Sequence, residues 1–318
     1  MKVLHIGMGE WGIWWFHALC DRSDIEIVGI VDLDESKRVE GYPFYTDAAL
    51  AMQELKPDFI LNATPPAIHH QINRWAVAQN IPILCEKPIA ESYEDALELV
   101  EFAKQGHKIV IAENYRYLAT NQYVKAVLDR GLIGKISSIN IRFAKKHQME
   151  NYHAQLEHPL LVDVTMHHFD LLRYFTGIEV EKIYADFFIP GWSWYEGYSN
   201  VSATITMADG VRVNYLGSLD SNHDTSWNGD WEFVGELGTL SYHKDWLYVL
   251  NDNEFEKPWQ LDEDANDDKN LMLDDFLTFL RGGLVPATHI FDNIKTFRVV
   301  HAAIQSFNSR KEVIIDAD

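Results

Sequence analysis

The chain has 318 residues, of which 47% are hydrophobic and 24% charged, and its formal net charge is -21 at pH 7. This length is more than one small hydrophobic core fills and predicts two domains, while the composition excludes a disordered or fibrous protein. Nucleic-acid backbones and anionic membranes would repel so acidic a surface. We therefore expect no nucleic acid and no membrane among its partners.

Neither the cysteines nor the first residues indicate export. Cys20 and Cys85 lie in apolar, periodic segments, as small buried hydrophobic residues do, and form no CxxC pair. The opening MKVLHIG is too short for the apolar part of a signal peptide, and no apolar run reaches the roughly 18 residues of a membrane span. We therefore expect a cytoplasmic protein.

The first third of the chain alternates short apolar runs with helical patterns. Strands are predicted at Lys2–Ile6, Glu26–Asp32, Phe59–Ala63, Pro82–Cys85 and Lys108–Ala112. Helices are predicted between them at Ile13–Cys20, Ala67–Gln79 and Ser92–Gln105. Strands of about five residues separated by such helices are typical of βαβ units, which predicts an α/β domain with a doubly wound parallel sheet.

After about residue 114 the pattern changes to a run of strands. Two helices, at 122–129 and 164–175, are each followed by glycine and flank a strand at 135–143. Further strands are predicted at Lys182–Ile189, Val201–Met207, Val211–Leu219, Trp231–Val234, Thr239–Tyr242 and Trp246–Leu250. An acidic loop at 262–268, two helices at 271–280 and 292–308 and a strand at 312–316 close the chain. We predict domains at 1–117 and 118–318, the second an α+β domain with a large open, mostly antiparallel sheet.

A glycine-rich turn lies between the first predicted strand and the first predicted helix. Gly7, Gly9 and Gly12 form a G-x-G-x-x-G sequence in the strand–turn–helix context that dinucleotide binding requires. The first glycine permits a tight turn, the second lets the backbone approach a pyrophosphate, and the third packs the helix on the strand. The N–H groups at the start of the helix then face the phosphates. This turn predicts a Rossmann domain that binds NAD or NADP.

The end of the second predicted strand bears on the choice between the two cofactors. Asp32 lies 20 residues after Gly12, where an acid accepts hydrogen bonds from the adenosine ribose hydroxyls. A carboxylate there would repel a 2′-phosphate, so NAD is preferred. Ser36, Lys37 and Arg38 follow and could hold that phosphate if the loop folds back, so NADP remains open.

Two segments at the ends of the next strands also carry chemistry. Thr64, Pro65 and His69 follow one strand, and Glu86-Lys87-Pro88 follows the other. The carboxyl ends of parallel strands line the ligand crevice, so Lys87 is expected to face the nicotinamide end of the cofactor. Its ammonium could polarise a developing carbonyl or alkoxide there. Taken alone, Lys87 is better explained as a surface lysine that pairs with Glu86, and only the whole set of motifs favours the catalytic role.

Asp163 and His167 lie four residues apart at the start of a predicted helix, and hence on one helix face. His167 could take the proton of a substrate hydroxyl as hydride leaves the carbon. Asp163 could orient the ring and the substrate or stabilise the charged imidazole. Taken alone, the pair is also explained as a capping aspartate and a half-buried histidine.

Together with the glycine turn, these segments resemble the Gfo/Idh/MocA (glucose–fructose oxidoreductase/inositol dehydrogenase) family over most of the chain. The motifs E-K-P and D-x-x-x-H are the most specific part. The resemblance implies hydride transfer between nicotinamide and a secondary alcohol of a sugar, cyclitol or related polyol, with Lys87, Asp163 and His167 as catalytic residues. It also implies a homodimer or homotetramer formed through the exposed face of the C-terminal sheet.

The resemblance implies further binding residues. For the cofactor these are Gly7, Gly9, Glu10, Trp11, Gly12, Asp32, Lys37, Arg38, Thr64, Pro65, His69, Glu86, Lys87, Asn114 and Arg116. For the substrate they are Lys87, Tyr115, Arg116, Asp163 and His167. Thr165 departs from the glycine usual in the family, and residues 155–160 replace its glycine-rich loop, so the shape of the substrate pocket is open.

Several residues and two other functions stay open at this point. Aromatic packing explains Tyr115 and Arg116 nearly as well as a site does, and the tryptophans could stack on sugars or belong to the core. These are Trp192, Trp194, Trp227 and Trp231. His153, His158, His167 and His168 lack a convincing set of metal ligands, so no metal is expected. The other functions are NAD-assisted glycoside hydrolysis and a non-catalytic nucleotide-sensing regulator, and the catalytic set weighs against the regulator.

Overall fold

The computed structural model describes residues 1–148, 154–244, 246–251, 254–255, 259–260 and 267–316. The chain divides into two compact units, one of residues 1–114 with 268–297, the other of residues 115–267 with 298–318. The segment 268–297 therefore packs in the first unit, although our sequence-based division placed it in the second domain. Most of the acidic stretch 262–268, and His153, lie outside the described residues.

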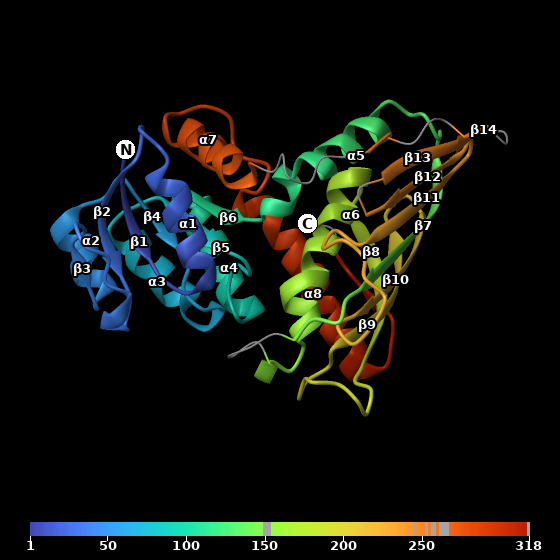
Figure 1. The fold of residues 1–318 in the computed structure, drawn as a ribbon, viewed down its shortest axis with the longest axis horizontal. Helices are drawn as coiled ribbons and strands as arrows, with labels where there is room; N and C mark the ends of the chain where they lie inside the picture. The colour runs from blue at the N-terminus through green and yellow to red at the C-terminus, as the bar shows by residue number, and fades with distance from the viewer. Residues whose placement is uncertain (149–153, 245, 252–253, 256–258, 261–266, 317–318) are drawn as a thin grey trace. The chain divides into compact units, whose positions relative to one another are not determined.

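The first unit is built on a six-stranded parallel sheet (Figure 1). Its strands are β1 (Lys2–Ile6), β2 (Glu26–Val31), β3 (Phe44–Tyr45), β4 (Phe59–Asn62), β5 (Ile83–Glu86) and β6 (Ile109–Ala112). The order β3-β2-β1-β4-β5-β6 is that of a doubly wound sheet, with β1 and β4 adjacent where the winding reverses. Every residue of β4 and β6 is buried, as expected of strands covered on both faces. The predicted Rossmann fold is confirmed.

Helices connect these strands. They are α1 (Glu10–Cys20), α2 (Ala48–Leu55), α3 (Pro66–Ala78) and α4 (Tyr93–Lys104), and the later helix α7 (Asp268–Leu280) belongs to the same unit. Ser92 is the N-cap of α4, since its hydroxyl accepts a hydrogen bond from the Asp95 N–H at 3.1 Å. Short 3₁₀ helices lie at Glu35–Lys37 and Asn114–Tyr117.

The second unit contains a large mixed sheet, with ten strands among the described residues. The strands are β7 (Ile136–Ala144), β8 (Val180–Phe188), β9 (Asn200–Met207), β10 (Arg212–Ser218), β11 (Asp230–Gly235), β12 (Thr239–His243), β13 (Trp246–Asn251), β14 (Glu254–Phe255), β15 (Trp259–Gln260) and β16 (Val313–Ile314). The order is β14-β13-β12-β11-β7-β10-β9-β8-β16, with β15 paired to β13. All these pairs are antiparallel except β7 with β10, so the mostly antiparallel sheet is confirmed.

Helices cover one face of this sheet. They are α5 (Ala119–Asp129), α6 (Met166–Thr176) with the π-helical turn Leu161–Thr165 before it, and the end of α8 (Ile290–Ser309), and all lie on the same side in Figure 1. Alternation along each strand separates the faces: Val213 and Tyr215 of β10 are buried, whereas Asn214 and Leu216 are exposed. Gly177 ends α6 in the left-handed conformation at φ +68°, as predicted.

Strand directions place the start of α6 at one end of the strands of this sheet. Because β7 and β10 are parallel, they end at the same edge, where Ala144 pairs with Ser218. Ser218 also pairs with Asn200, so the loop between β8 and β9 lies at that edge too. The helix α6 runs from this end of the strands to Gly177 at the opposite end. Strand β8 begins there and runs back. The loops 189–199 and 219–229, and the described residues 145–148 and 154–160, therefore lie at the end of the strands where Asp163 lies.

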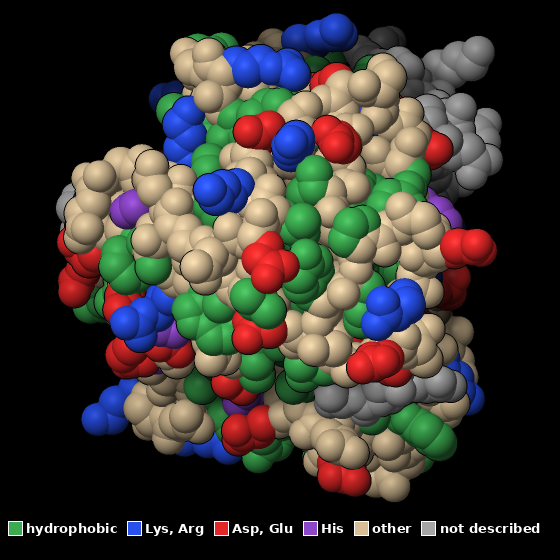
Figure 2. Space-filling model, turned by 90° about the vertical axis from the view of Figure 1, so that its left-hand side faces the viewer, with side chains coloured by type: hydrophobic (Ala, Val, Ile, Leu, Met, Phe, Trp, Pro, Cys, Tyr) green, Lys and Arg blue, Asp and Glu red, His purple; other side chains and the backbone are tan. Residues whose placement is uncertain are grey.

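Basic side chains are dispersed on the face of the molecule that Figure 2 shows. On the side drawn in Figure 2, Lys and Arg side chains lie singly among acidic and apolar ones rather than in one patch. Within the described ranges, every helix is too short or too polar to span a lipid bilayer.

Candidate active site

The turn between β1 and α1 explains all three glycines. Gly7 has φ +95°, and a Cβ there would lie 2.5 Å from the Ala63 carbonyl oxygen. A Cβ on Gly12 would lie 2.1 Å from the Gly7 carbonyl oxygen, so the helix packs tightly on the turn. Gly9 is the N-cap of α1, and a Cβ there would meet no atom within 4 Å. Gly9 therefore borders open space in front of the first N–H groups of α1, those of Glu10 and Trp11 among them, which have no helical partner.

This arrangement fits a dinucleotide. The open approach at Gly9 and the free helical N–H groups suit a pyrophosphate. Asp32 lies next to the glycine turn. Its Oδ2 accepts a hydrogen bond from the Met8 N–H at 2.7 Å, and its Oδ1 accepts one from the Asp34 N–H at 2.9 Å. A carboxylate has about four acceptor sites, so these bonds leave capacity for ribose hydroxyls. Asp32 thus holds the glycine turn as well as the end of β2.

The two cations beyond Asp32 are part of the loop that follows β2. The Arg38 guanidinium lies 4.7 Å from the centre of the Phe44 ring and 3.9 Å from the Glu35 carboxylate. Lys37 ends the short helix that Asp34 caps by accepting the Ser36 N–H at 2.9 Å. Arg38 is therefore engaged with neighbouring side chains of its own unit.

The loop after β5 presents Lys87, and Glu86 fixes its start. The Trp15 indole N–H donates to Glu86 Oε1 at 2.6 Å, and the Lys87 main-chain N–H donates to Glu86 Oε2 at 3.0 Å. Lys87 itself is half-buried, and its peptide bond to Pro88 is cis. The Glu86 carboxylate is thus an anchor between α1 and the lysine loop. Sequence reasoning missed Trp15, although a buried indole N–H usually has a partner.

The loop after β4 is held by a cluster of polar side chains. Asn62 Oδ1 accepts hydrogen bonds from the Thr64 hydroxyl at 2.6 Å and the Thr64 N–H at 3.3 Å. Asn62 Nδ2 donates to Asn73 Oδ1 at 2.9 Å. Thr64 is half-buried and Pro65 is exposed, while His69 lies fully buried behind them.

Asn114 ends the main part of the first unit. Its side-chain N–H donates to Asp268 Oδ2 at 2.8 Å, at the start of α7. Lys269, 3.7 Å from the same carboxylate, lies over the rings of Trp14 and Trp15 at 5.4 and 5.9 Å. These contacts explain why α7 belongs to the first unit.

In the second unit, Asp163 and His167 lie on consecutive helical segments. Asp163 is half-buried in the π-helical turn, and His167 is 3% exposed at the start of α6. A π turn is wider than an α turn, so the predicted regular four-residue spacing is locally altered, a feature common at functional sites. The His167 ring stacks on Tyr115, with centroids 4.0 Å and planes 4° apart.

Arg116 is engaged within the second unit. Its Nε and Nη2 donate to the two carboxylate oxygens of Asp170, each at 2.6 Å, and both side chains are buried. Arg173 lies 3.6 Å from the same carboxylate and forms a bidentate pair with Glu179. This buried network joins the segment after residue 114 to α6.

His168 faces the core behind His167. Its Nε2 lies 2.9 Å from the Trp227 carbonyl and its Nδ1 lies 2.9 Å from the Tyr215 hydroxyl. Since a carbonyl only accepts, Nε2 carries the proton and Nδ1 accepts from Tyr215. The Tyr215 oxygen then accepts from the Thr165 hydroxyl at 2.9 Å. Burial lowers the pKa of His168 to about 3, so the ring is neutral and structural, and Thr165 serves this network.

The four tryptophans fall into two groups. Trp231 is 2% exposed and belongs to the core. Trp192, Trp194 and Trp227 are exposed by 80%, 58% and 40% and lie in the loops at the edge of the sheet where α6 begins. The Lys145 ammonium lies 5.1 Å from the Trp227 ring centre. These three rings are available for contact with a ligand.

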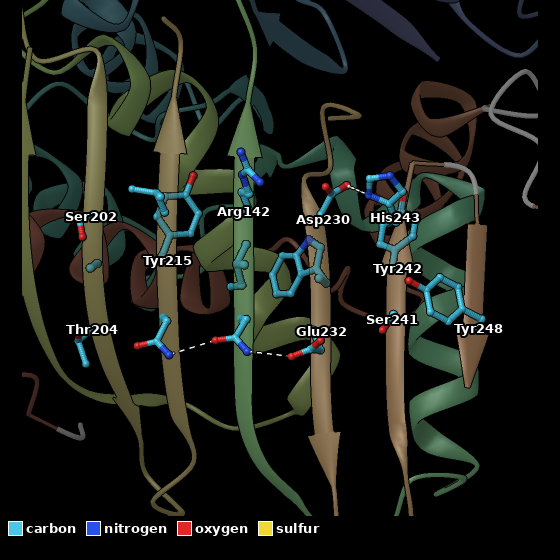
Figure 3. Close-up of a pocket in the computed structure, with 16 residues that line it drawn as sticks. Arg142, Ser202, Thr204, Tyr215, Asp230, Glu232, Ser241, Tyr242, His243 and Tyr248 are labelled. Carbon is cyan, nitrogen blue, oxygen red and sulfur yellow. Dashed lines mark hydrogen bonds and ion pairs between the residues drawn. The ribbon is translucent and has the colours of Figure 1, made fainter. Parts of the chain in front are cut away.

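The open face of the sheet carries a groove of about 540 Å³ lined by both polar and apolar side chains. Along its centre, Asn214 donates to Asn140 at 3.1 Å, and Asn140 donates to Glu232 at 3.0 Å (Figure 3). His243 pairs with Asp230 at 2.8 Å at its upper end. Exposed apolar side chains lie on the same face, namely Tyr184, Phe188, Leu216, Trp246 and Leu250. Within the part of the chain that is described, no three His, Cys, Asp or Glu side chains are arranged to hold a metal ion.

Comparison with known families assigns both halves of the chain. Residues 1–114 match the model of the oxidoreductase family with an NAD-binding Rossmann fold, GFO/IDH/MocA. Residues 121–241 match the GFO/IDH/MocA C-terminal domain.

Individual proteins agree with this assignment. The chain is 27% identical to the protein y4oX of Sinorhizobium fredii, over 96% of this chain and 93% of that one. It is 28% identical to inositol 2-dehydrogenase of Pseudarthrobacter chlorophenolicus. This match covers 58% of this chain and 56% of that enzyme. An oxidoreductase from Agrobacterium radiobacter, solved with NAD+, L-tartaric acid and magnesium, has the same fold, with a TM-score of 0.88, 23% identity and coverage of 99% and 98%.

Proposed function

The chain belongs to the Gfo/Idh/MocA family of oxidoreductases, and from this premise we propose that it oxidises, reversibly, a secondary alcohol of a sugar, cyclitol or related polyol. It is an NAD(P)-dependent dehydrogenase that acts on CH–OH groups. The substrate class is supported by relatives described as inositol 2-dehydrogenase and D-apiose dehydrogenase. Their names give a cyclitol and a sugar as substrates.

One observation carries the proposal furthest. The open N-terminus of α1 at Gly9 and the Lys87 loop lie at the carboxyl edge of one parallel sheet, and Trp15 of α1 holds Glu86 of that loop at 2.6 Å. In doubly wound sheets ligands bind at this edge, where the strand order reverses. The Lys87 loop and the glycine turn therefore lie at the same end of one sheet, which supports a cation beside the bound dinucleotide.

The protein supplies binding, orientation and proton transfer, whereas a bound nicotinamide supplies the hydride acceptor or donor. We assign Gly7, Gly9 and Gly12 to the pyrophosphate and Asp32 to the ribose. The Lys87 ammonium donates a hydrogen bond to the substrate oxygen and stabilises the negative charge that develops as the alcohol becomes a carbonyl. Glu86, held by Trp15, keeps that loop in place.

His167 acts as the general base of the proposed reaction. Its imidazole takes the proton of the substrate hydroxyl during oxidation and returns it during reduction. Asp163, in the π-helical turn that precedes α6, orients the substrate and favours the charged imidazole. The stack on Tyr115 fixes the plane of the ring. Lys87, Asp163 and His167 together form the proposed catalytic set.

A substrate screen tests this function. Purified protein is incubated with NAD+ or NADP+ and a panel of inositols, pentoses, hexoses, sugar acids and hydroxy acids, and reduced cofactor is followed by absorbance. Turnover of at least one polyol, abolished in Lys87→Ala, is expected. Cleavage of a nitrophenyl glycoside without net NADH formation would instead indicate NAD-assisted hydrolysis. Tight NADH binding with no oxidation of any compound in the panel and no cleavage of the glycoside would indicate a regulator.

Two further properties are proposed for the enzyme. The protein forms a homodimer or homotetramer through the open face of the sheet, because exposed apolar side chains flank its polar centre. Such a contact buries about 1,000 Å² or more in stable assemblies, and light scattering at micromolar concentration then gives at least twice the mass of 36.7 kDa. A persistent monomer contradicts this. The protein is also expected in the cytoplasm, which cell fractionation tests.

A further inference from the structure

His69 lies between the two loops that follow β4 and β5. It is completely buried, and each ring nitrogen meets a main-chain carbonyl of one loop. Nδ1 lies 2.8 Å from the Pro88 oxygen, next to Lys87, and Nε2 lies 2.7 Å from the Thr64 oxygen. Both nitrogens are therefore occupied by protein atoms, and the ring faces the loops rather than a ligand.

The chemistry of the three groups makes this an unusual contact. Carbonyl oxygens only accept hydrogen bonds, and a neutral imidazole has a single N–H. Burial lowers the pKa of His69, so the neutral ring is favoured and its one proton serves one carbonyl at a time. The short distance to the other carbonyl is then maintained by the loops on either side. The ring therefore hydrogen-bonds one carbonyl and packs against the other, and so it sets the spacing between the two loops.

The two loops depend on His69 to different extents. Thr64 has a second attachment, since its hydroxyl and N–H both donate to Asn62. On the other side, Glu86 is held by Trp15 before Lys87, while the carbonyl after Lys87, that of Pro88, is the one that His69 meets. The lysine is thus held by Glu86 on one side and by His69 on the other.

We propose that His69 is a positioning residue that fixes the Lys87 loop against the loop of Thr64, and so sets where the Lys87 ammonium meets the substrate oxygen. This inference rests on the proposed role of Lys87. It assigns to His69 a role other than direct contact with the cofactor. The glycine turn and Asp32 do not depend on it.

The test compares His69→Leu and His69→Gln with a matched control, His70→Leu. Gln retains a side-chain N–H of similar reach and should restore one of the two contacts, whereas Leu restores neither. His70 is the next residue of α3, but its ring pairs with Asp95 and Glu98 of α4 and is 18% exposed. Removing it deletes an imidazole from the same helix without touching either loop.

The first readout needs no substrate. Lys87 is labelled with acetic anhydride at low conversion, and its peptide is quantified by mass spectrometry, alongside NADH affinity by fluorescence titration. In His69→Leu the labelling rate of Lys87 should change several-fold while NADH affinity stays within about 3-fold, because the pyrophosphate site is intact. His69→Gln and His70→Leu should label as the wild type does. Unchanged labelling in His69→Leu would overturn the proposal even if no substrate is known.

A second readout uses turnover on any substrate that the screen identifies. A displaced lysine loop should lower kcat by roughly 10- to 100-fold with little change in KM for NAD, and Gln should recover most of the loss. Equal loss in His69→Leu and His69→Gln would contradict a positioning role. If His69→Leu does not fold, ¹H–¹⁵N spectra of the histidine rings of the wild type test the proposal instead. A protected, downfield ring N–H that disappears in His69→Gln supports the proposal, and its absence overturns it.

Discussion

The rings of Tyr115 and His167 lie face to face, with centroids 4.0 Å and planes 4° apart. Hydrogen bonds hold the chain on both sides of this stack. Asn121 donates to the Tyr115 carbonyl at 2.9 Å, and Arg116, next to Tyr115, pairs with Asp170 on the helix of His167. An aromatic face stabilises an adjacent cation. Tyr115 therefore holds the imidazole plane, and in the proposed reaction its ring face would stabilise the cation formed when His167 takes a proton.

Removing this stack should slow catalysis without loss of cofactor binding. Tyr115→Leu is expected to lower kcat by about 3- to 30-fold, the range of a desolvated cation–aromatic contact, whereas Tyr115→Phe should retain most activity. The acidic limb of the pH–rate profile should shift in the leucine variant only. Steady-state kinetics over a pH series check this, and a leucine variant with wild-type kcat and profile would refute the role.

The buried pair of Arg116 and Asp170 should matter for stability. Asp170→Asn leaves a buried guanidinium without its charge partner and is expected to lower the free energy of unfolding by about 3–5 kcal/mol. Arg310→Ala removes a comparable pair with Asp186, but this pair is exposed, and the loss should be below about 1 kcal/mol. Urea unfolding measures both. Equal effects would mean that Asp170 is not a structural partner of Arg116.

Two buried histidines predict lower stability in acid. Burial lowers the pKa of His5 to about 4 and that of His168 to about 3, from 6.5. Between these values the unfolded chain binds protons that the folded protein does not, so their contribution is complete above pH 6.5 and declines as the pH falls. Each group should cost about 1.4 kcal/mol per pH unit over this interval.

Replacement of one histidine isolates this effect. His5→Leu removes one titrating group from β1, so the free energy of unfolding should fall less steeply between pH 6.5 and pH 4.5 than in the wild type. Urea unfolding at a series of pH values within this window provides the slopes. Identical slopes in the two proteins would show that His5 is not neutral in the folded state.

Cofactor preference should depend on Asp32. Its carboxylate lies at the end of β2, held by the N–H groups of Met8 and Asp34, and Arg38 is engaged with Phe44 and Glu35. Calorimetry should therefore give tighter binding of NADH than of NADPH. Asp32→Ser should narrow the difference, because it removes the charge that repels a 2′-phosphate. Tighter NADPH binding by the wild type would assign the phosphate to Lys37 and Arg38 instead.

Local periodicity predicted most of the fold. Strands of the first unit read as continuous apolar runs and those of the second as alternation, and the glycines marked the turn after β1 and the end of α6. The parallel pairing of β7 with β10, and the packing of 268–297 in the first unit, were not predictable because they depend on contacts between distant segments. The two-residue strand β3 is too short to give a pattern.

Only part of the candidate site was predictable from the sequence. The glycine turn and Asp32 have a fixed sequence context, and their observed geometry agrees with it. Other contacts had no local signal: Arg116 pairs with Asp170 54 residues away, and Trp15 reaches Glu86 across 71. Contacts between His69 and main-chain carbonyls depend on no partner side chain at all. The catalytic roles of Lys87, Asp163 and His167 stay predictions.

Turnover by paired variants tests the central claim most directly. On the substrate found by the screen, Lys87→Ala and His167→Ala should each lose roughly 100-fold or more in kcat, while both fold and bind NADH as the wild type does. His70→Leu, which removes a ring that pairs with Asp95 and Glu98 of α4, serves as the control and should keep full activity. If either variant retains near-wild-type kcat on that substrate, the proposed catalytic set, and with it this account of the reaction, is contradicted.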